Sequence, residues 1–157
     1  FTNLIRLAEF LGITTRVRII NDSALNIDDY QLGKFDMVLT SPPYFNLEVY
    51  SDESTQSIHG INSYDEWVSL FLKPLILKSI GVLNDTGMSC WNVHNVGKMH
   101  MIDDVLSIHS EAGFNMAKTV SVVSSKRQMN NVSGKDKNED LTNCFTRVKS
   151  IPTQKFF

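Results

Sequence analysis

Ser41-Pro42-Pro43-Tyr44 is the part of the chain whose residue types are best suited to chemistry. It directly follows Phe35–Thr40, an apolar run rich in strand-forming residues. Two consecutive prolines cannot continue a central strand, so the strand must end there and lead into a turn. Because proline has no N–H, this turn offers mainly carbonyl oxygens, to which Ser41 adds a hydroxyl and Tyr44 a flat aromatic ring.

Such a turn suits the exocyclic amine of a nucleobase, which is a poor nucleophile because its lone pair is delocalised into the ring. If Ser41 and the carbonyl of Pro42 accept the two N–H hydrogens, the lone pair localises on the nitrogen. Stacking of the base on Tyr44 would then hold this nitrogen in line with an electrophilic methyl group. The chemistry requires neither a metal nor a nucleophilic side chain. Since it uses the ring face, Tyr44→Phe should keep most of the activity.

The spacing of apolar residues predicts the helices and strands that must position this turn. Leu4, Leu7, Ala8 and Leu11 predict a helix over 2–11, ended by Gly12. Further helices are expected over 64–80, with a kink at Pro74, and over 99–112; a turn is expected at 84–87; strands are expected at 17–20, 35–40, 88–93, 118–124 and 143–149. This order predicts a doubly wound, mostly parallel α/β sheet. The last two strands have no helix between them and should form an antiparallel hairpin at its edge.

The turn and its lead-in Asp36-Met37-Val38-Leu39-Thr40 resemble motif IV of the S-adenosylmethionine-dependent amino-methyltransferases, which modify cytosine N4 or adenine N6 in DNA. The resemblance covers about residues 17–125 and implies a Rossmann-like methyltransferase fold. It also implies that Ser41, Pro42, Pro43 and Tyr44 are catalytic and that the target base leaves the duplex. Serine at the first position resembles many cytosine-N4 enzymes and aspartate is commoner in adenine-N6 enzymes, so both bases stay open.

The same resemblance implies S-adenosylmethionine as the cofactor. Asn21, Asp22 and Ser23 resemble the position that contacts the cofactor adenine, with Ser41 as a further cofactor contact. The family's glycine-rich loop and its acidic ribose-binding residue are absent from these 157 residues. We therefore expect a single partial catalytic domain over 1–157 that lacks the first strand or strands and binds the cofactor weakly or not at all.

Contacts with nucleic acid are expected from two loops. Phe45 and Tyr50 could frame a flipped base, or they could be ordinary surface aromatics. Residues 1–117 carry a net charge of −7 and residues 118–157 a net charge of +5, so a polyanion should approach the C-terminal third. There, a polar and mobile loop over 125–140 holds Lys126 and Arg127, which suit phosphate contacts. Simple solvation of this loop is an equal alternative.

Composition and spacing exclude several other classes of protein. With 42% hydrophobic residues and a net charge of −2, the chain is neither disordered nor collagen-like. Cys90 and Cys144 lie in apolar runs and are expected to be buried, reduced thiols, which fits a cytoplasmic protein. The histidines have no metal-ligand spacing and are expected at the surface or in loops; they are His59, His94, His100 and His109. No apolar run is long enough to span a membrane.

These observations favour a site-specific DNA methyltransferase of the restriction-modification kind, acting on DNA with a restriction nuclease as a candidate partner. An RNA base amino-methyltransferase is the second interpretation. A degenerate methyltransferase fold that serves as a binding or scaffold module is the third. The recognition sequence, the modified base and the oligomeric state stay open.

Overall fold

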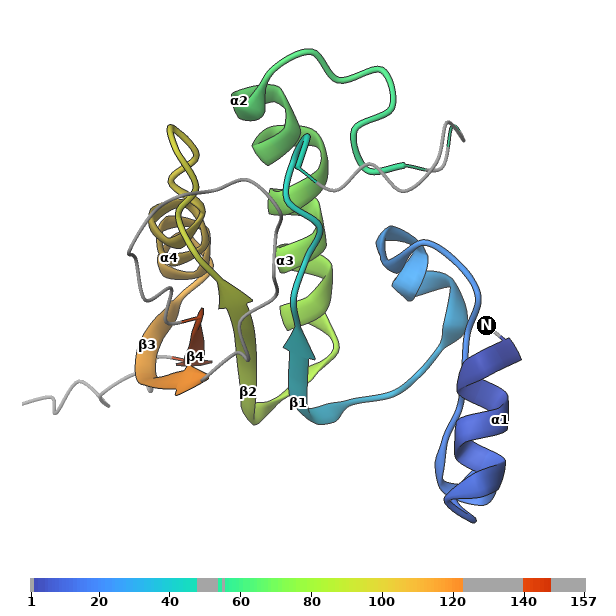
Figure 1. Ribbon diagram of the computed structural model, residues 1–157. Helices are drawn as coiled ribbons and strands as arrows, with labels where there is room; N and C mark the ends of the chain where they lie inside the picture. Colours follow the sequence, from blue (N-terminus) through green and yellow to red (C-terminus); the bar gives the residue numbers. More distant parts are fainter. Residues whose placement is uncertain (1, 48–53, 55, 123–139, 148–157) are drawn as a thin grey trace, which may run out of the picture.

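The computed structural model describes residues 2–47, 54, 56–122 and 140–147 (Figure 1). Its helical elements are α1 (Thr2–Phe10), η1 (Thr14–Arg16), η2 (Ala24–Tyr30), α2 (Tyr64–Trp67), η3 (Val68–Leu72), α3 (Lys73–Gly81) and α4 (Met101–Glu111). Its strands are β1 (Phe35–Thr40), β2 (Leu83–Val93), β3 (Phe114–Val122) and β4 (Asp140–Arg147). The expected α/β class is confirmed.

The four strands form one sheet in the order β1-β2-β4-β3. β1 and β2 are parallel, and β4 is antiparallel to both β2 and β3. The antiparallel C-terminal hairpin is therefore confirmed, with β3 as the outer strand. The sheet is less parallel than expected, because β4 inserts between β2 and β3 and leaves β1–β2 as the parallel pair among the described strands.

The predicted strand at 17–20 is wrong. These residues follow η1 without regular structure, and Val17 and Arg18 are exposed. A short β-branched run becomes a strand only where another strand completes its hydrogen bonds, so its residue types alone do not suffice. The helix expected just before it is present as α1, and the chain turns at Gly12 with φ of 62°.

A nearly continuous helical segment, made of α2, η3 and α3, fills the expected span 64–80. Ser63 begins it, since its hydroxyl accepts the N–H of Glu66 at 3.2 Å while the Glu66 carboxylate accepts the N–H of Asn62 at 2.9 Å. The expected distortion at Pro74 takes the form of the π-helical turn η3, which directly precedes it. The wider turn relieves the clash that a proline ring makes with the preceding turn of an α-helix.

β2 begins earlier than predicted, because the turn expected at 84–87 is an irregularity within the strand. Phe35 pairs with Leu83 and Met37 with Met88, so residues 84–87 lie opposite Asp36 alone. A Cβ atom on Gly87 would lie 3.0 Å from the carbonyl oxygen of Phe35. The side chain of Asn84 donates a hydrogen bond to Asp36 across this bulge.

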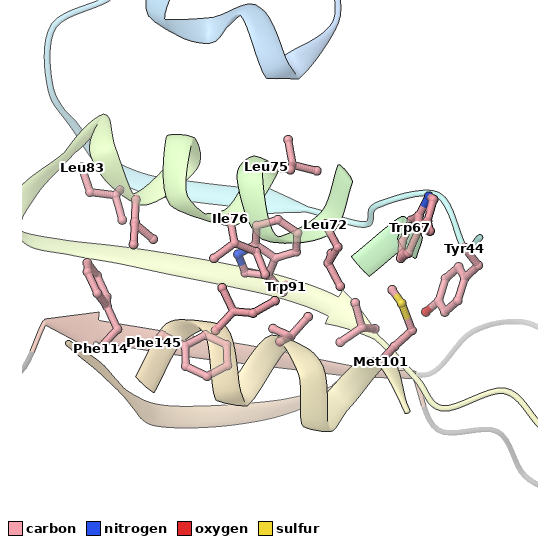
Figure 2. Close-up of a cluster of buried hydrophobic side chains, with 14 residues drawn as sticks. Tyr44, Trp67, Leu72, Leu75, Ile76, Leu83, Trp91, Met101, Phe114 and Phe145 are labelled. Carbon is pink, nitrogen blue, oxygen red and sulfur yellow. The ribbon is translucent and has the colours of Figure 1, made fainter. Parts of the chain in front are cut away.

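Helices α3 and α4 pack on one face of the sheet and enclose the core (Figures 1 and 2). Trp67 and Trp91 are fully buried there. On β1 the alternate residues Phe35, Met37 and Leu39 are exposed, with Leu39 at 69%. The core thus lies on the helical side of the sheet and reaches the carboxyl end of β2, where Val93 is fully buried.

Candidate functional site

The parallel pair brings two segments of the chain to the same edge of the sheet. β1 ends at Thr40 and is followed by the turn Ser41–Tyr44, while β2 ends at Val93 and is followed at once by His94. Both arrowheads point toward this edge in Figure 1. In open α/β sheets, ligands bind beyond the carboxyl ends of parallel strands. The predicted turn therefore lies where a ligand site is expected.

The turn is anchored at both of its ends. The ladder with β2 holds Thr40 opposite Trp91 on one side. On the other side Tyr44 is 6% exposed and belongs to the core cluster, where Figure 2 shows it at the end beside Met101 and Trp67. Pro42 is buried as well, whereas Ser41 is exposed. The Ser41 hydroxyl is thus accessible to a ligand, but most of the Tyr44 ring that we expected to face a base is covered by protein.

Tyr44 and His94 are joined at two points, although they lie 50 residues apart. The backbone N–H of His94 donates to the Tyr44 hydroxyl at 2.9 Å, and His94 Nδ1 lies 2.7 Å from the same oxygen. Their rings are 4.6 Å apart between centroids and are tilted by 40°. In the tautomer that carries its proton on Nε2, Nδ1 accepts the hydroxyl hydrogen of Tyr44. The sequence offered one sign of this contact, which is the place of His94 directly after a predicted strand.

Phe45 packs against the start of the long helical segment. Its ring centroid lies 6.3 Å from those of Tyr64 and Trp67. Tyr64 donates a hydrogen bond to Asp104 at 2.5 Å, and burial together with this bond raises the pKa of the Tyr64 hydroxyl well above its usual range. Phe45 is half-buried in this aromatic group, so framing of a base by Phe45 stays a prediction.

Asp22 is engaged in hydrogen bonds within its own segment. Its carboxylate accepts the N–H of Ser23 at 2.6 Å, the amide of Asn26 at 2.9 Å and the hydroxyl of Tyr30 at 2.5 Å. The bond from Tyr30 is the largest of the causes that hold the pKa of Asp22 below its usual value. Ser23 caps η2 by accepting the N–H of Leu25. Asp22 and Ser23 thus stabilise the start of η2, and the expected contact of Asn21, Asp22 and Ser23 with a cofactor adenine stays a prediction.

Two observations test whether the described residues fit S-adenosylmethionine. The exposed hydroxyl of Ser41 suits a polar group beside the turn. At the other expected contact, three protein donors already occupy the Asp22 carboxylate. Of the two expected cofactor contacts, Ser41 is therefore exposed, whereas the Asp22 carboxylate is largely engaged within its own segment.

Several expected contacts lie outside the described residues, namely Tyr50, Lys126 and Arg127. Within the described ranges, no group of three or more histidine, cysteine, aspartate or glutamate residues could hold a metal ion. None of the helices in the described part of the chain is both long enough and apolar enough to cross a membrane.

His109 corrects the expectation that every histidine lies at the surface or in a loop. It is fully buried on α4, where its ring stacks on Phe145 at 4.0 Å and its Nε2 lies 2.9 Å from the Ser89 hydroxyl. Because Ser89 and Phe145 come from β2 and β4, this histidine joins helix to sheet. Burial lowers the pKa of His109 to about 4, so it is neutral at physiological pH.

Comparison with known proteins supports the fold. No family model matches the chain, and no curated protein matches it. Its structure is similar to a crystal structure from Clostridium thermocellum described as that of a "putative rRNA-methylase", with a TM-score of 0.56 and 15% sequence identity. The match covers 94% of this chain and 69% of that one. We conclude that the chain has a methyltransferase-like α/β fold, with Ser41–Tyr44 at the edge where its parallel strands end.

Proposed function

We propose that this protein is an amino-methyltransferase that moves a methyl group from S-adenosylmethionine to the exocyclic amine of a flipped DNA base, either cytosine N4 or adenine N6. One observation carries the proposal. An intact Ser-Pro-Pro-Tyr turn follows the carboxyl end of β1, in a methyltransferase-like fold and beside a parallel neighbour strand. Fold similarity alone does not define an activity, so the weight rests on the residues of this turn.

In this proposal Ser41 and Pro42 orient the amine. Ser41 is exposed directly after β1, and Pro42 is buried. A turn held by β1 on one side and by Tyr44 on the other needs little reorganisation when its oxygens accept N–H hydrogens. Preorganised acceptors of this kind stabilise the transition state because they strengthen as charge develops on the nitrogen.

Tyr44 holds the base in this proposal, but its 6% exposure sets a condition. A base can stack on the ring only after a neighbouring group moves off it, so entry of the base is coupled to a local opening. Phe45 and Tyr50 are proposed to frame the base, and Lys126 and Arg127 to contact phosphates. S-adenosylmethionine would supply the electrophilic methyl group.

A second candidate is methylation of an RNA base. The similar structure from Clostridium thermocellum is that of a "putative rRNA-methylase", and the same turn chemistry applies to an amine in either nucleic acid. Recognition of RNA commonly targets unpaired bases that can stack on aromatic rings. The two candidates therefore differ in the substrate rather than in the roles of Ser41 and Tyr44.

Single-turnover methyl transfer tests the proposal. The full natural chain, with saturating labelled S-adenosylmethionine, is mixed with DNA or RNA oligonucleotides that contain an unpaired cytosine or adenine. Ser41→Ala should lower the transfer rate by about 10²–10³, the usual effect of losing one transition-state hydrogen bond. Ser110→Ala, which alters an exposed serine on α4, is the matched control and should keep the parental rate.

Each outcome of this assay has a defined meaning. Label in DNA supports the proposal, and label in RNA alone supports the second candidate. A parental protein that labels neither polymer refutes both and leaves the scaffold interpretation. If Ser41→Ala transfers methyl groups at the parental rate, Ser41 does not contact the amine and the proposed chemistry is wrong.

A further inference from the structure

The two-point contact between Tyr44 and His94 has no role in the chemistry proposed so far. The hydroxyl oxygen of Tyr44 receives one hydrogen bond from the backbone of His94 and lies within bonding distance of its imidazole. Any residue except proline at position 94 can supply the backbone bond. The second bond requires an acceptor at the position of Nδ1, and among the common side chains only histidine, asparagine and aspartate place one there.

These contacts constrain the Tyr44 ring in two independent ways. A hydroxyl held at 2.9 and 2.7 Å fixes the far end of the ring axis, while the backbone after Pro43 fixes the near end. Rotation about that axis is still free in a tyrosine held only by its hydroxyl. The imidazole ring, 4.6 Å away between centroids, lies against Tyr44 and limits this rotation. His94 therefore contributes both to the direction and to the tilt of the ring.

We propose that His94 is a positioning residue, whose imidazole fixes the orientation of the Tyr44 ring that the target base meets once the local opening has uncovered it. The inference rests on the proposed function, since it assigns Tyr44 the base-binding role described above. It also changes one expectation from the sequence. If the hydrogen bonds of the Tyr44 hydroxyl hold the ring in place, Tyr44→Phe should lower the activity even though the ring face remains.

Three variants separate the imidazole from the rest of the site. His94→Ala removes Nδ1 and keeps the backbone N–H. His94→Asn restores an acceptor oxygen one bond from Cγ, where Nδ1 stands in histidine. His59→Ala is the matched control, because His59 is an exposed histidine distant in sequence from either strand end.

Two measurements on the full chain are informative, and the first does not depend on activity. The rate at which tetranitromethane nitrates Tyr44, followed by peptide mass spectrometry, reports how freely the ring is presented. His94→Ala should raise this rate severalfold, and His94→Asn and His59→Ala should stay near the parental value. In single-turnover methyl transfer, His94→Ala should be about fivefold slower, as expected for one hydrogen bond. His94→Asn should recover most of this loss.

A double variant tests whether the imidazole acts through Tyr44. Tyr44→Phe and Tyr44→Phe/His94→Ala should differ in transfer rate by less than the fivefold expected between the parental protein and His94→Ala, because only the ring contact is left for the imidazole to make. Losses that multiply, or parental nitration and transfer rates in His94→Ala, would overturn the inference. A parental protein without methyl transfer would refute the proposed function instead, and nitration alone would then decide the role of His94.

Discussion

His109 should make the stability of the protein depend on pH. Its Nδ1 lies 2.8 Å from the carbonyl oxygen of Val105 and donates to it, so Nε2 is the acceptor for the Ser89 hydroxyl at 2.9 Å. The Ser89 oxygen in turn accepts the indole N–H of Trp91 at 2.7 Å. The neutral imidazole thus satisfies every donor in this buried group, and a second proton on Nε2 would face a hydroxyl that already donates to it.

The magnitude follows from the pKa. Burial is the dominant cause that lowers the pKa of His109 from 6.5 to about 4, partly opposed by the bond to Val105. The unfolded chain therefore binds one more proton than the folded chain between these values. The contribution of His109 to the free energy of unfolding is complete above pH 6.5 and is lost as the pH falls toward 4. At about 1.4 kcal/mol per pKa unit, the loss is about 3 kcal/mol.

Urea unfolding between pH 4 and 7.5 measures this effect. His109→Gln keeps a polar, uncharged side chain but cannot titrate, so its free energy of unfolding should fall less steeply below pH 6.5 than that of the parental protein. Only the pH slope is compared, because the substitution also changes packing against Phe145. His59→Gln, at an exposed position, should keep the parental slope. Equal slopes for the parental protein and His109→Gln would refute this account.

Two further predictions concern the sheet. Gly87→Ala should lower the free energy of unfolding by about 1–3 kcal/mol, because the new methyl group would lie 3.0 Å from the backbone oxygen of Phe35. Gly81→Ala, whose Cβ would meet no atom within 4 Å, should be neutral or slightly stabilising in the same urea titration. Burial and the neighbouring Cys144 raise the pKa of the Cys90 thiol to about 12, so iodoacetamide at pH 8 should leave native Cys90 unmodified and alkylate it in urea. Rapid alkylation of the native protein would contradict the burial of this pair.

The sequence was enough to predict those helices and strands whose ends are marked by neighbouring residues such as proline or glycine. Phe35–Thr40 is a strand that stops at two prolines, and the structure has it with the same bounds. The helix over 99–112 is present as α4, and the chain leaves it at Gly113 with φ of 79°. In each case the residues that end the element are adjacent to it in the chain, so pattern and covalent geometry were enough.

The sequence did not predict structure that depends on pairing with a strand far away in the chain. Val17–Ile20 has the composition of a strand but does not form one. Residues 84–87 have the composition of a turn, yet pairing with β1 keeps them within β2 as a bulge around Gly87. A short sequence records its own preferences, whereas the ladder that overrides them is formed by residues far away in the chain.

The same distinction separates the two halves of the candidate site. The sequence by itself determined the turn Ser41–Tyr44 and its place after a strand, because prolines and strand formers act locally. Only the tertiary structure decided that Tyr44 is buried and held by His94, since the two residues are 50 positions apart and meet because β1 and β2 are parallel and end together. It likewise decided that His109 is a core residue, because Ser89 lies on another element and satisfies its nitrogen. Hydrogen bonds between distant residues leave no periodic trace in the sequence, which is why they had to be found in the fold.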